Sequence, residues 1–150
     1  MELYLKTRQY VCRPINSRFK QRYVTGTTKF SPSIMVWGSI RKDGKRILIK
    51  CEGTLDSDEY QRILDVRLPY LYNTRFIFQQ DGATCHTSRS TTTYLDNKGI
   101  QVLRPWPPQS PDLNVIECVW DILKDKIKQK MPKTLGELWI MANEEFNAIK

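Results

Sequence analysis

The sequence predicts an α/β domain built around a mixed sheet, and three observations carry that prediction. Two hydrophobic runs flank an Asp-Gly turn within residues 33–51, which is the pattern of an antiparallel hairpin. Further apolar runs at residues 75–81 and 100–103 each follow a helical segment, as strands joined by helical crossovers do. The chain has 150 residues, enough for one domain with a buried core, so we expect a single domain.

Residues 1–32 precede the hairpin and predict a basic arm or loop, which leaves residues 33–150 as the core. Cations alternate with aromatic residues in this arm without helical periodicity, and proline and glycine interrupt it. Such a mixture suits nucleic-acid backbones and bases, and it equally suits a solvated loop that its aromatic residues anchor to the core. The candidate nucleic-acid-binding residues of the arm are Arg13, Arg18, Lys20 and Arg22.

A helix is expected directly after the hairpin strands, which cover residues 33–40 and 46–51. Asp56 and Glu59 have the Asp-x-x-Glu spacing of a capping box, which marks a helix N-terminus. Apolar residues continue the helical pattern to Leu68, and we expect Pro69 to disturb it.

The second half of the predicted sheet follows. Residues 75–81 predict a buried strand that ends on the carboxylate of Asp81. Residues 87–98 predict a short helix that Gly99 ends, although three consecutive threonines are poor helix formers. Residues 100–103 predict a further strand, which a proline-rich segment closes.

The strongest helical signal covers residues 110–130. Ser110 is the expected cap and Pro111 suits the first turn. Apolar residues recur at spacings of three and four and make one stripe, formed by Leu113, Ile116, Trp120, Leu123 and Ile127. Glu117 lies one to two turns into this helix and at the border of the stripe, where a carboxylate can face a cleft.

The far end of this helix is rich in lysine. Lys124 and Lys128 are candidate nucleic-acid-binding residues, and a solvated face helped by the helix dipole is the alternative reading. Thr134 is expected to begin a last helix that runs towards residue 150.

Composition narrows the class of partner. The net charge is +8 and the pI about 9.4, which favours nucleic acid through neutralisation of phosphates. Four scattered cysteines and one histidine do not make a zinc site of familiar spacing, and we expect reduced thiols. We expect no membrane span, because the apolar runs are too short, and no signal peptide.

Two carboxylates stand in distinctive local contexts. Asp81 ends the run Phe-Ile-Phe-Gln-Gln-Asp, and His86 follows five residues later. Glu117 ends the segment Trp-Pro-Pro-Gln-Ser-Pro-Asp-Leu-Asn-Val-Ile-Glu, which contains Asn114, and 35 residues separate the two acids. A strand tip and a helix that each carry a carboxylate can share a divalent metal, and such metals promote phosphodiester chemistry. In these motifs the chain, from about residue 10 to about residue 129, resembles the catalytic domain of the mariner-superfamily DDE transposases.

The resemblance implies a ribonuclease-H-like mixed sheet flanked by helices, and two Mg²⁺ or Mn²⁺ ions held by an Asp-Asp-Glu triad. Asp81 matches the second aspartate and Glu117 the glutamate, both catalytic and metal-binding. His86 and Asn114 match positions expected to support the ligands. The implied activity is metal-dependent DNA cleavage and strand transfer on double-stranded DNA, at transposon ends and target, by a homodimer in the nucleus.

One departure from the family qualifies these expectations. The first aspartate and the helix-turn-helix region that precede the arm in the family have no counterpart here, so we expect an N-terminally truncated catalytic domain. Its first central strand is then missing or only partly present, and residues 2–6 are expected to fill part of that place. We therefore expect a DDE transposase fragment, inactive as an isolated chain. The alternative is a non-catalytic DNA-binding or dimerisation module derived from a transposase. The Ser-Pro-Asp-Leu-Asn segment argues against a third reading, a ribonuclease-H-type nuclease.

Overall fold

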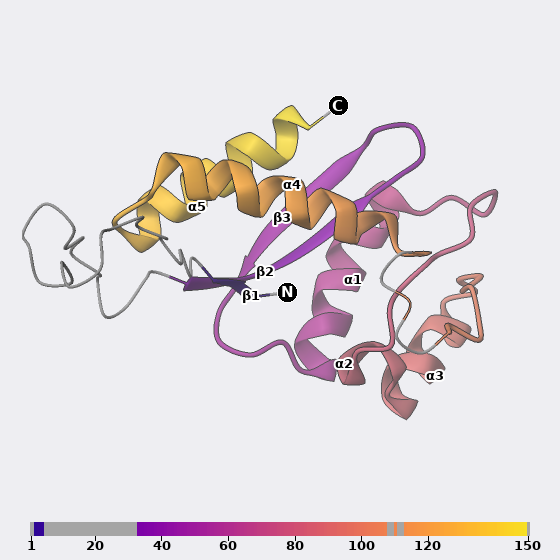
Figure 1. Cartoon of the computed structure of the whole chain (residues 1–150). Helices are drawn as coiled ribbons and strands as arrows, with labels where there is room; N and C mark the ends of the chain where they lie inside the picture. Colours follow the sequence, from indigo (N-terminus) through magenta and orange to yellow (C-terminus); the bar gives the residue numbers. More distant parts are fainter. Residues whose placement is uncertain (1, 5–32, 108–109, 111–112, 150) are drawn as a thin grey trace, which may run out of the picture.

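The computed structural model describes residues 2–4, 33–107, 110 and 113–149, and only the backbone of the first of these ranges. The described residues form a mixed α/β structure in which helices lie against an antiparallel sheet of order β1-β2-β3 (Figure 1). The strands are β1 Glu2–Tyr4, β2 Ser33–Ile40 and β3 Arg46–Cys51. The helices are α1 Ser57–Leu71, α2 Thr84–Thr87, α3 Arg89–Asn97, α4 Val115–Lys130 and α5 Leu135–Ala148.

The predicted hairpin is confirmed at both strands. β2 and β3 pair antiparallel along their length, with Trp37 opposite Ile49. The amide of Arg41 donates to the carbonyl of Lys45 at 2.8 Å and closes the turn. Gly44 has φ +86°, a conformation that glycine adopts at no steric cost, which is why the Asp-Gly pair signals this turn.

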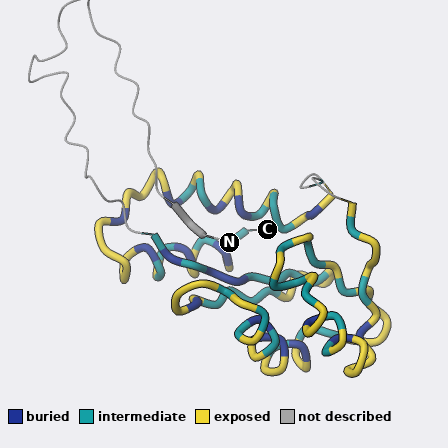
Figure 2. The backbone as a smooth tube through the Cα atoms, turned by 90° about the horizontal axis from the view of Figure 1, so that it is seen from below, coloured by how far each residue is buried: buried dark blue, intermediate teal, exposed yellow. Residues whose placement is uncertain are grey.

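Alternation along β2 divides the core between two faces of the sheet, because successive strand residues point to opposite sides. Ile34 and Val36 pack with α4 and α5 on one face. Trp37 packs with α1 and α3 on the other face. The exposed positions lie in the loops and on the outer sides of the helices (Figure 2). The sheet is therefore the middle layer, with α4 and α5 on one face and α1 and α3 on the other.

The prediction for residues 2–6, which placed them in the first central strand between β2 and the Asp81 segment, is not met in full. β1 pairs antiparallel with β2, with Leu3 opposite Ile34, on the edge of β2 that faces away from β3. A short strand thus fills part of the expected place beside β2. The described residues form no pairing between β1 and residues 75–81, so the other half of the prediction is not met.

The predicted strands at residues 75–81 and 100–103 are wrong as regular strands. They meet only at one parallel bridge, where the Phe78 amide donates to Gln101 O at 2.7 Å and the Leu103 amide donates to Phe78 O at 2.8 Å. Ile77 is 56% exposed, so the apolar run is not buried as a whole. A regular strand needs hydrogen-bonded partner residues along its length. Among the described residues, these two segments have a partner at one position only.

Two helix predictions also need correction. α1 continues through Pro69 to Leu71, because a proline in the last turn removes only one hydrogen bond and the Tyr72 amide still donates to Leu68 O at 2.7 Å. The single helix predicted for residues 87–98 is two helices, α2 and α3, which break at Ser88. That residue has extended backbone, and its hydroxyl accepts from the Thr91 amide at 3.2 Å, so it caps α3.

α4 begins later than predicted. It starts at Val115 with Asn114 at the N-cap position, and Ser110 lies outside the helix. Trp120, Leu123 and Ile127 are buried as the stripe predicts, whereas Leu113 precedes the helix and is 54% exposed. The Thr134 hydroxyl accepts from the Glu137 amide at 3.1 Å, which confirms the predicted start of α5.

None of the helices within the described part of the chain is long and apolar enough to cross a membrane.

Candidate active site

Asp81 lies after the Phe78 bridge and before α2, and one of its oxygens is firmly held. Oδ1 accepts from the Ala83 amide at 3.0 Å and lies 2.5 Å from His86 Nδ1. The hydrogen bond from His86 lowers the pKa of Asp81, partial burial opposes it, and the Ala83 amide adds to the lowering. Within the described residues no donor reaches Oδ2. Asp81 is therefore a preformed carboxylate with one oxygen turned away from its protein partners.

His86 is fixed from several sides. Its ring lies against Tyr60, with centroids 4.3 Å apart, and Gln80 Nε2 donates to its carbonyl at 2.8 Å. The Tyr60 hydroxyl in turn donates to Gln80 Oε1 at 2.9 Å. The His86 Nε2 atom is buried and has no partner among the described residues. Because an ionised carboxylate only accepts, Nδ1 is the nitrogen that donates to Asp81.

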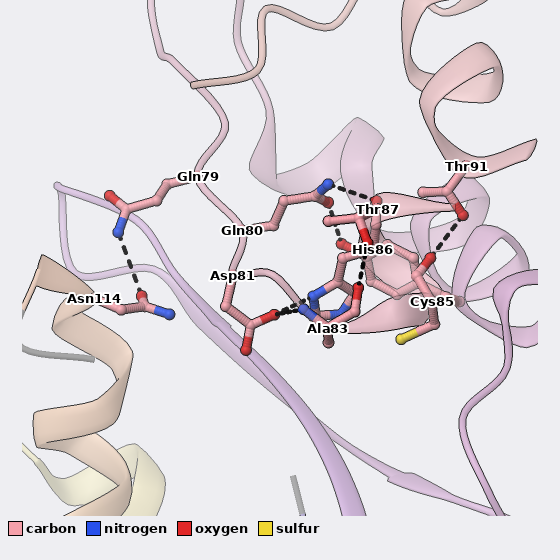
Figure 3. A network of polar contacts seen from close by, with 10 residues as sticks. Gln79, Gln80, Asp81, Ala83, Cys85, His86, Thr87, Thr91 and Asn114 are labelled. Carbon is pink, nitrogen blue, oxygen red and sulfur yellow. Dashed lines mark hydrogen bonds and ion pairs between the residues drawn. The ribbon is translucent and has the colours of Figure 1, made fainter. Parts of the chain in front are cut away.

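The short helix α2 that carries His86 is anchored to α3. The buried Thr91 hydroxyl donates to Cys85 O at 2.7 Å (Figure 3). The Ser88 hydroxyl donates to Thr91 Oγ1 at 3.0 Å. The pKa of Tyr60 is raised by burial, and the charges of Cys85 and Asp81 add to this effect. Tyr60 consequently stays neutral. Its ring packs against His86 and its hydroxyl donates to Gln80.

Glu117 lies in the first turn of α4, not one to two turns into the helix as the sequence predicted. Its amide donates to Asn114 O at 2.9 Å, and its side chain is half-buried. The N-terminus of a helix carries partial positive charge, which attracts anionic groups. No described cation forms an ion pair with Glu117. Its charge therefore remains available to a ligand.

The two carboxylate-bearing segments are joined by one side chain. Gln79 Nε2 donates to Leu113 O at 3.2 Å and to Asn114 Oδ1 at 3.4 Å. In Figure 3 the Gln79 side chain points towards Asn114 at the start of α4, whereas Asp81 points towards His86 and Ala83. The structure thus brings Asp81 and His86 into contact and links their segment to Asn114, which is one helical turn from Glu117.

Asp81 and Glu117 offer part of the set of ligands that a divalent cation requires. Mg²⁺ and Mn²⁺ prefer carboxylate oxygens, so Asp81 and Glu117 suit them in kind. Within the described residues, no group of three or more His, Cys, Asp or Glu side chains could hold a metal. Asp81 and Glu117 are therefore carboxylates of the right kind for such an ion, but the described residues by themselves do not form a complete metal site.

The predicted nucleic-acid-binding lysines of α4 are engaged in ion pairs. Lys124 pairs with Asp121 at 3.4 Å, and Lys128 pairs with Asp125 at 3.0 Å. Two further lysines of this helix both contact Glu145 of α5. Lys124 and Lys128 therefore have carboxylate partners on their own helix, and their role in binding nucleic acid stays a prediction. The other predicted cations, Arg13, Arg18, Lys20 and Arg22, lie outside the described residues.

Residues 6–139 match the DDE superfamily endonuclease family, and the chain belongs to that family. This family generally uses divalent metal ions. Among curated proteins, the chain is 34% identical over 125 residues to the transposable element Tcb1 transposase of Caenorhabditis briggsae, which covers 80% of this chain and 45% of that protein. It is 33% identical over 123 residues to the Tc1 transposase of Caenorhabditis elegans, covering 79% of this chain and 45% of that protein.

The Tc3 transposase of Caenorhabditis elegans is 42% identical over 95 residues, which cover 61% of this chain and 29% of that protein. The chain thus spans less than half the length of the curated relatives that it matches. The homologues are Tc1-type transposases, and the family confirms the resemblance that the Asp81 and Glu117 motifs indicated.

Sequence reasoning missed three residues of the site. Gln79, Gln80 and Tyr60 carry the contacts that hold the aspartate segment, yet the sequence predicted only the two acids, His86 and Asn114 as residues of this site. The signal for the two glutamines was present, since they directly precede Asp81 in the motif. Tyr60 belongs to α1 and reads as an ordinary core residue, so its role depends on a contact that no local pattern reveals.

Proposed function

We propose that this chain is part of the catalytic domain of a Tc1/mariner-type DDE transposase, with a ribonuclease-H-like arrangement, and that its site serves metal-dependent DNA cleavage and strand transfer. The observation that carries the proposal is the joint between Gln79 and the start of α4. That joint links the segment of Asp81 to the helix turn that bears Glu117. The family membership supplies the reaction class.

Asp81 and Glu117 would hold Mg²⁺ or Mn²⁺, two ions in the complete site. When bound, such ions activate the attacking hydroxyl and stabilise charge on the phosphate. His86 and the Ala83 amide keep Asp81 ionised and fix Oδ1, which leaves Oδ2 to serve as the ligand atom. Glu117 lies in the first turn of α4, where no described cation pairs with it. The role of the protein is thus to hold two anionic oxygens at fixed places.

The described residues supply two of the three carboxylates of such a triad, so we propose that this chain alone does not cleave DNA. The third carboxylate would come from outside the described residues. Double-stranded DNA is the proposed partner, bound through the net charge of +8 and through Arg13, Arg18, Lys20 and Arg22. A homodimer and a nuclear location complete the proposal by analogy with transposases as a class.

Duplex binding and nicking test this function together. Fluorescence anisotropy with a labelled duplex should show binding that falls steeply as salt rises. A supercoiled plasmid in Mn²⁺ should stay intact with this chain. Nicking that disappears in Asp81→Asn and Glu117→Gln would show that the chain supplies the third ligand itself, and would overturn the proposed inactivity.

The second candidate is a non-catalytic DNA-binding or dimerisation module. The incomplete set of acidic ligands among the described residues favours it. A pure binding module keeps its DNA affinity in Asp81→Ala and Glu117→Ala, with or without Mg²⁺. Binding that requires both carboxylates and the metal would exclude this candidate.

A further inference from the structure

We infer that Gln79 is a positioning residue that sets the relative placement of the two carboxylates. The inference rests on the proposed function, because it assumes that Asp81 and Glu117 hold one divalent metal site together. It assigns a role to a side chain that carries no charge and that metal chemistry alone would not select.

The contacts of Gln79 are the first argument. Its amide nitrogen reaches two acceptors, Leu113 O and Asn114 Oδ1, at 3.2 Å and 3.4 Å. Within the described residues, these are the hydrogen bonds that join residues 75–83 to α4 or to the turn before it. The bridge at Phe78 and the contacts of Gln80 instead hold the segment to residues 101–103, α1 and α2.

The behaviour of Asn114 is the second argument. Asparagine at an N-cap position ordinarily accepts a hydrogen bond from an amide of its own helix. Asn114 occupies that position in α4, is only 9% exposed, and makes no such bond. Its side-chain oxygen accepts from Gln79 instead. A group that would otherwise stabilise the helix end is therefore used to join two segments.

Short covalent steps separate this joint from both acids. Asp81 follows Gln79 by two positions in the chain, which limits the separation of their Cα atoms to about 7 Å. Glu117 follows Asn114 by three residues, a spacing that places side chains about 5–6 Å apart on one helix face. Movement at the joint is therefore passed to both ligands, whereas loss of contacts elsewhere in the segment moves Asp81 alone.

Iron-directed backbone cleavage tests the inference. Fe²⁺ replaces Mg²⁺ at the site, and ascorbate with peroxide then generates radicals that cut the chain near the bound ion. The wild-type chain should be cut near residue 81 and near residue 117. Gln79→Met keeps the length of the side chain and removes its donor, so we expect cutting at one segment only. Its Kd for Mn²⁺ should rise about tenfold or more, the usual effect of losing a ligand-orienting partner.

Two variants keep the experiment decisive. Gln101→Met makes the same change at an exposed glutamine outside the joint, and it should cut and bind like wild type. Asn114→Ala removes one acceptor and should reproduce part of the Gln79→Met pattern. Equal cutting of both segments by folded Gln79→Met overturns the inference and leaves the proposed function standing. Absence of cutting at both segments in wild type also overturns the inference, because the chain then has no shared metal site for Gln79 to align; the proposed function, which leaves the third carboxylate to residues outside the described part, is tested by the duplex-binding and plasmid assays instead.

Discussion

α4 packs against β2 through the contact between Trp120 and Gly38, and replacement of Gly38 by alanine gives the sharpest prediction about this fold. A Cβ atom at Gly38 would lie 2.3 Å from Trp120 Cη2 and 2.8 Å from Cζ2. The first distance is about 1 Å shorter than an ordinary van der Waals contact. Trp120 is 3% exposed and stacks on Phe146, so its ring has little room to move. Overpacking of this kind costs about 1–3 kcal/mol.

The assay is thermal unfolding followed by circular dichroism. A loss of about 2 kcal/mol should lower Tm by about 4–8 °C for a domain of this size. Trp120→Phe removes the ring atoms that meet the new methyl group, so the double variant should be more stable than the sum of the single effects predicts. Because Trp120 follows Glu117 by less than one turn, Gly38→Ala should also weaken Mn²⁺ binding.

Gly136→Ala is the matched control. Gly136 lies in α5, and a Cβ there would have only one neighbour, the Thr134 hydroxyl oxygen at 4.0 Å. Alanine should leave Tm unchanged or raise it, since it favours the helix by up to about 1 kcal/mol. An unchanged Tm for Gly38→Ala, or strict additivity with Trp120→Phe, would refute the packing argument.

Three further predictions concern single side chains. Lys126 and Lys130 of α4 lower the pKa of Glu145 to about 2. The stabilising contribution of Glu145 is therefore present above pH 4.5 and is lost as pH falls towards 2. Glu145→Gln should therefore flatten the dependence of Tm on pH in that range. The same fall of Tm with acid in the variant as in wild type would contradict this. Asp56→Ala removes the cap of α1 and should cost about 1 kcal/mol in urea unfolding; no shift in midpoint would argue against the cap. His86→Ala should raise the pKa of Asp81 towards 3.8, measured by carbon NMR of its carboxyl group, whereas an unmoved pKa would mean that His86 does not hold it.

Local signals predicted the parts of the fold that depend on nearby residues. The Asp-Gly turn fixed the hairpin because glycine accepts the positive φ at residue 44. The spacing of Asp56 and Glu59 located the start of α1, where the Glu59 amide donates to Asp56 Oδ1 at 2.8 Å. The stripe of α4 predicted the buried Trp120, since helical periodicity and burial are linked by geometry.

Features that depend on distant partners were not predictable in this way. The apolar run ending at Asp81 has the composition of a buried strand, yet Ile77 is exposed because the segment pairs at one position only. The start of α4 moved from Ser110 to Val115, and the role of Asn114 there depends on Gln79, which lies 35 residues earlier in the chain. Sequence motifs therefore identified the two acids and their family, while the side chains that place them emerged from the folded structure.

Mn²⁺ binding, measured by electron paramagnetic resonance of the free ion, tests the central claim most directly. The account predicts that the wild-type chain binds Mn²⁺ and that Asp81→Asn and Glu117→Gln each lose most of that affinity. The double variant should bind Mn²⁺ no more weakly than either single variant, because each substitution alone already removes the one shared site. Asp121→Asn, which removes an exposed acid from the same helix, should bind like wild type. Binding that survives either site substitution, or that Asp121→Asn impairs equally, would contradict a metal site shared by Asp81 and Glu117.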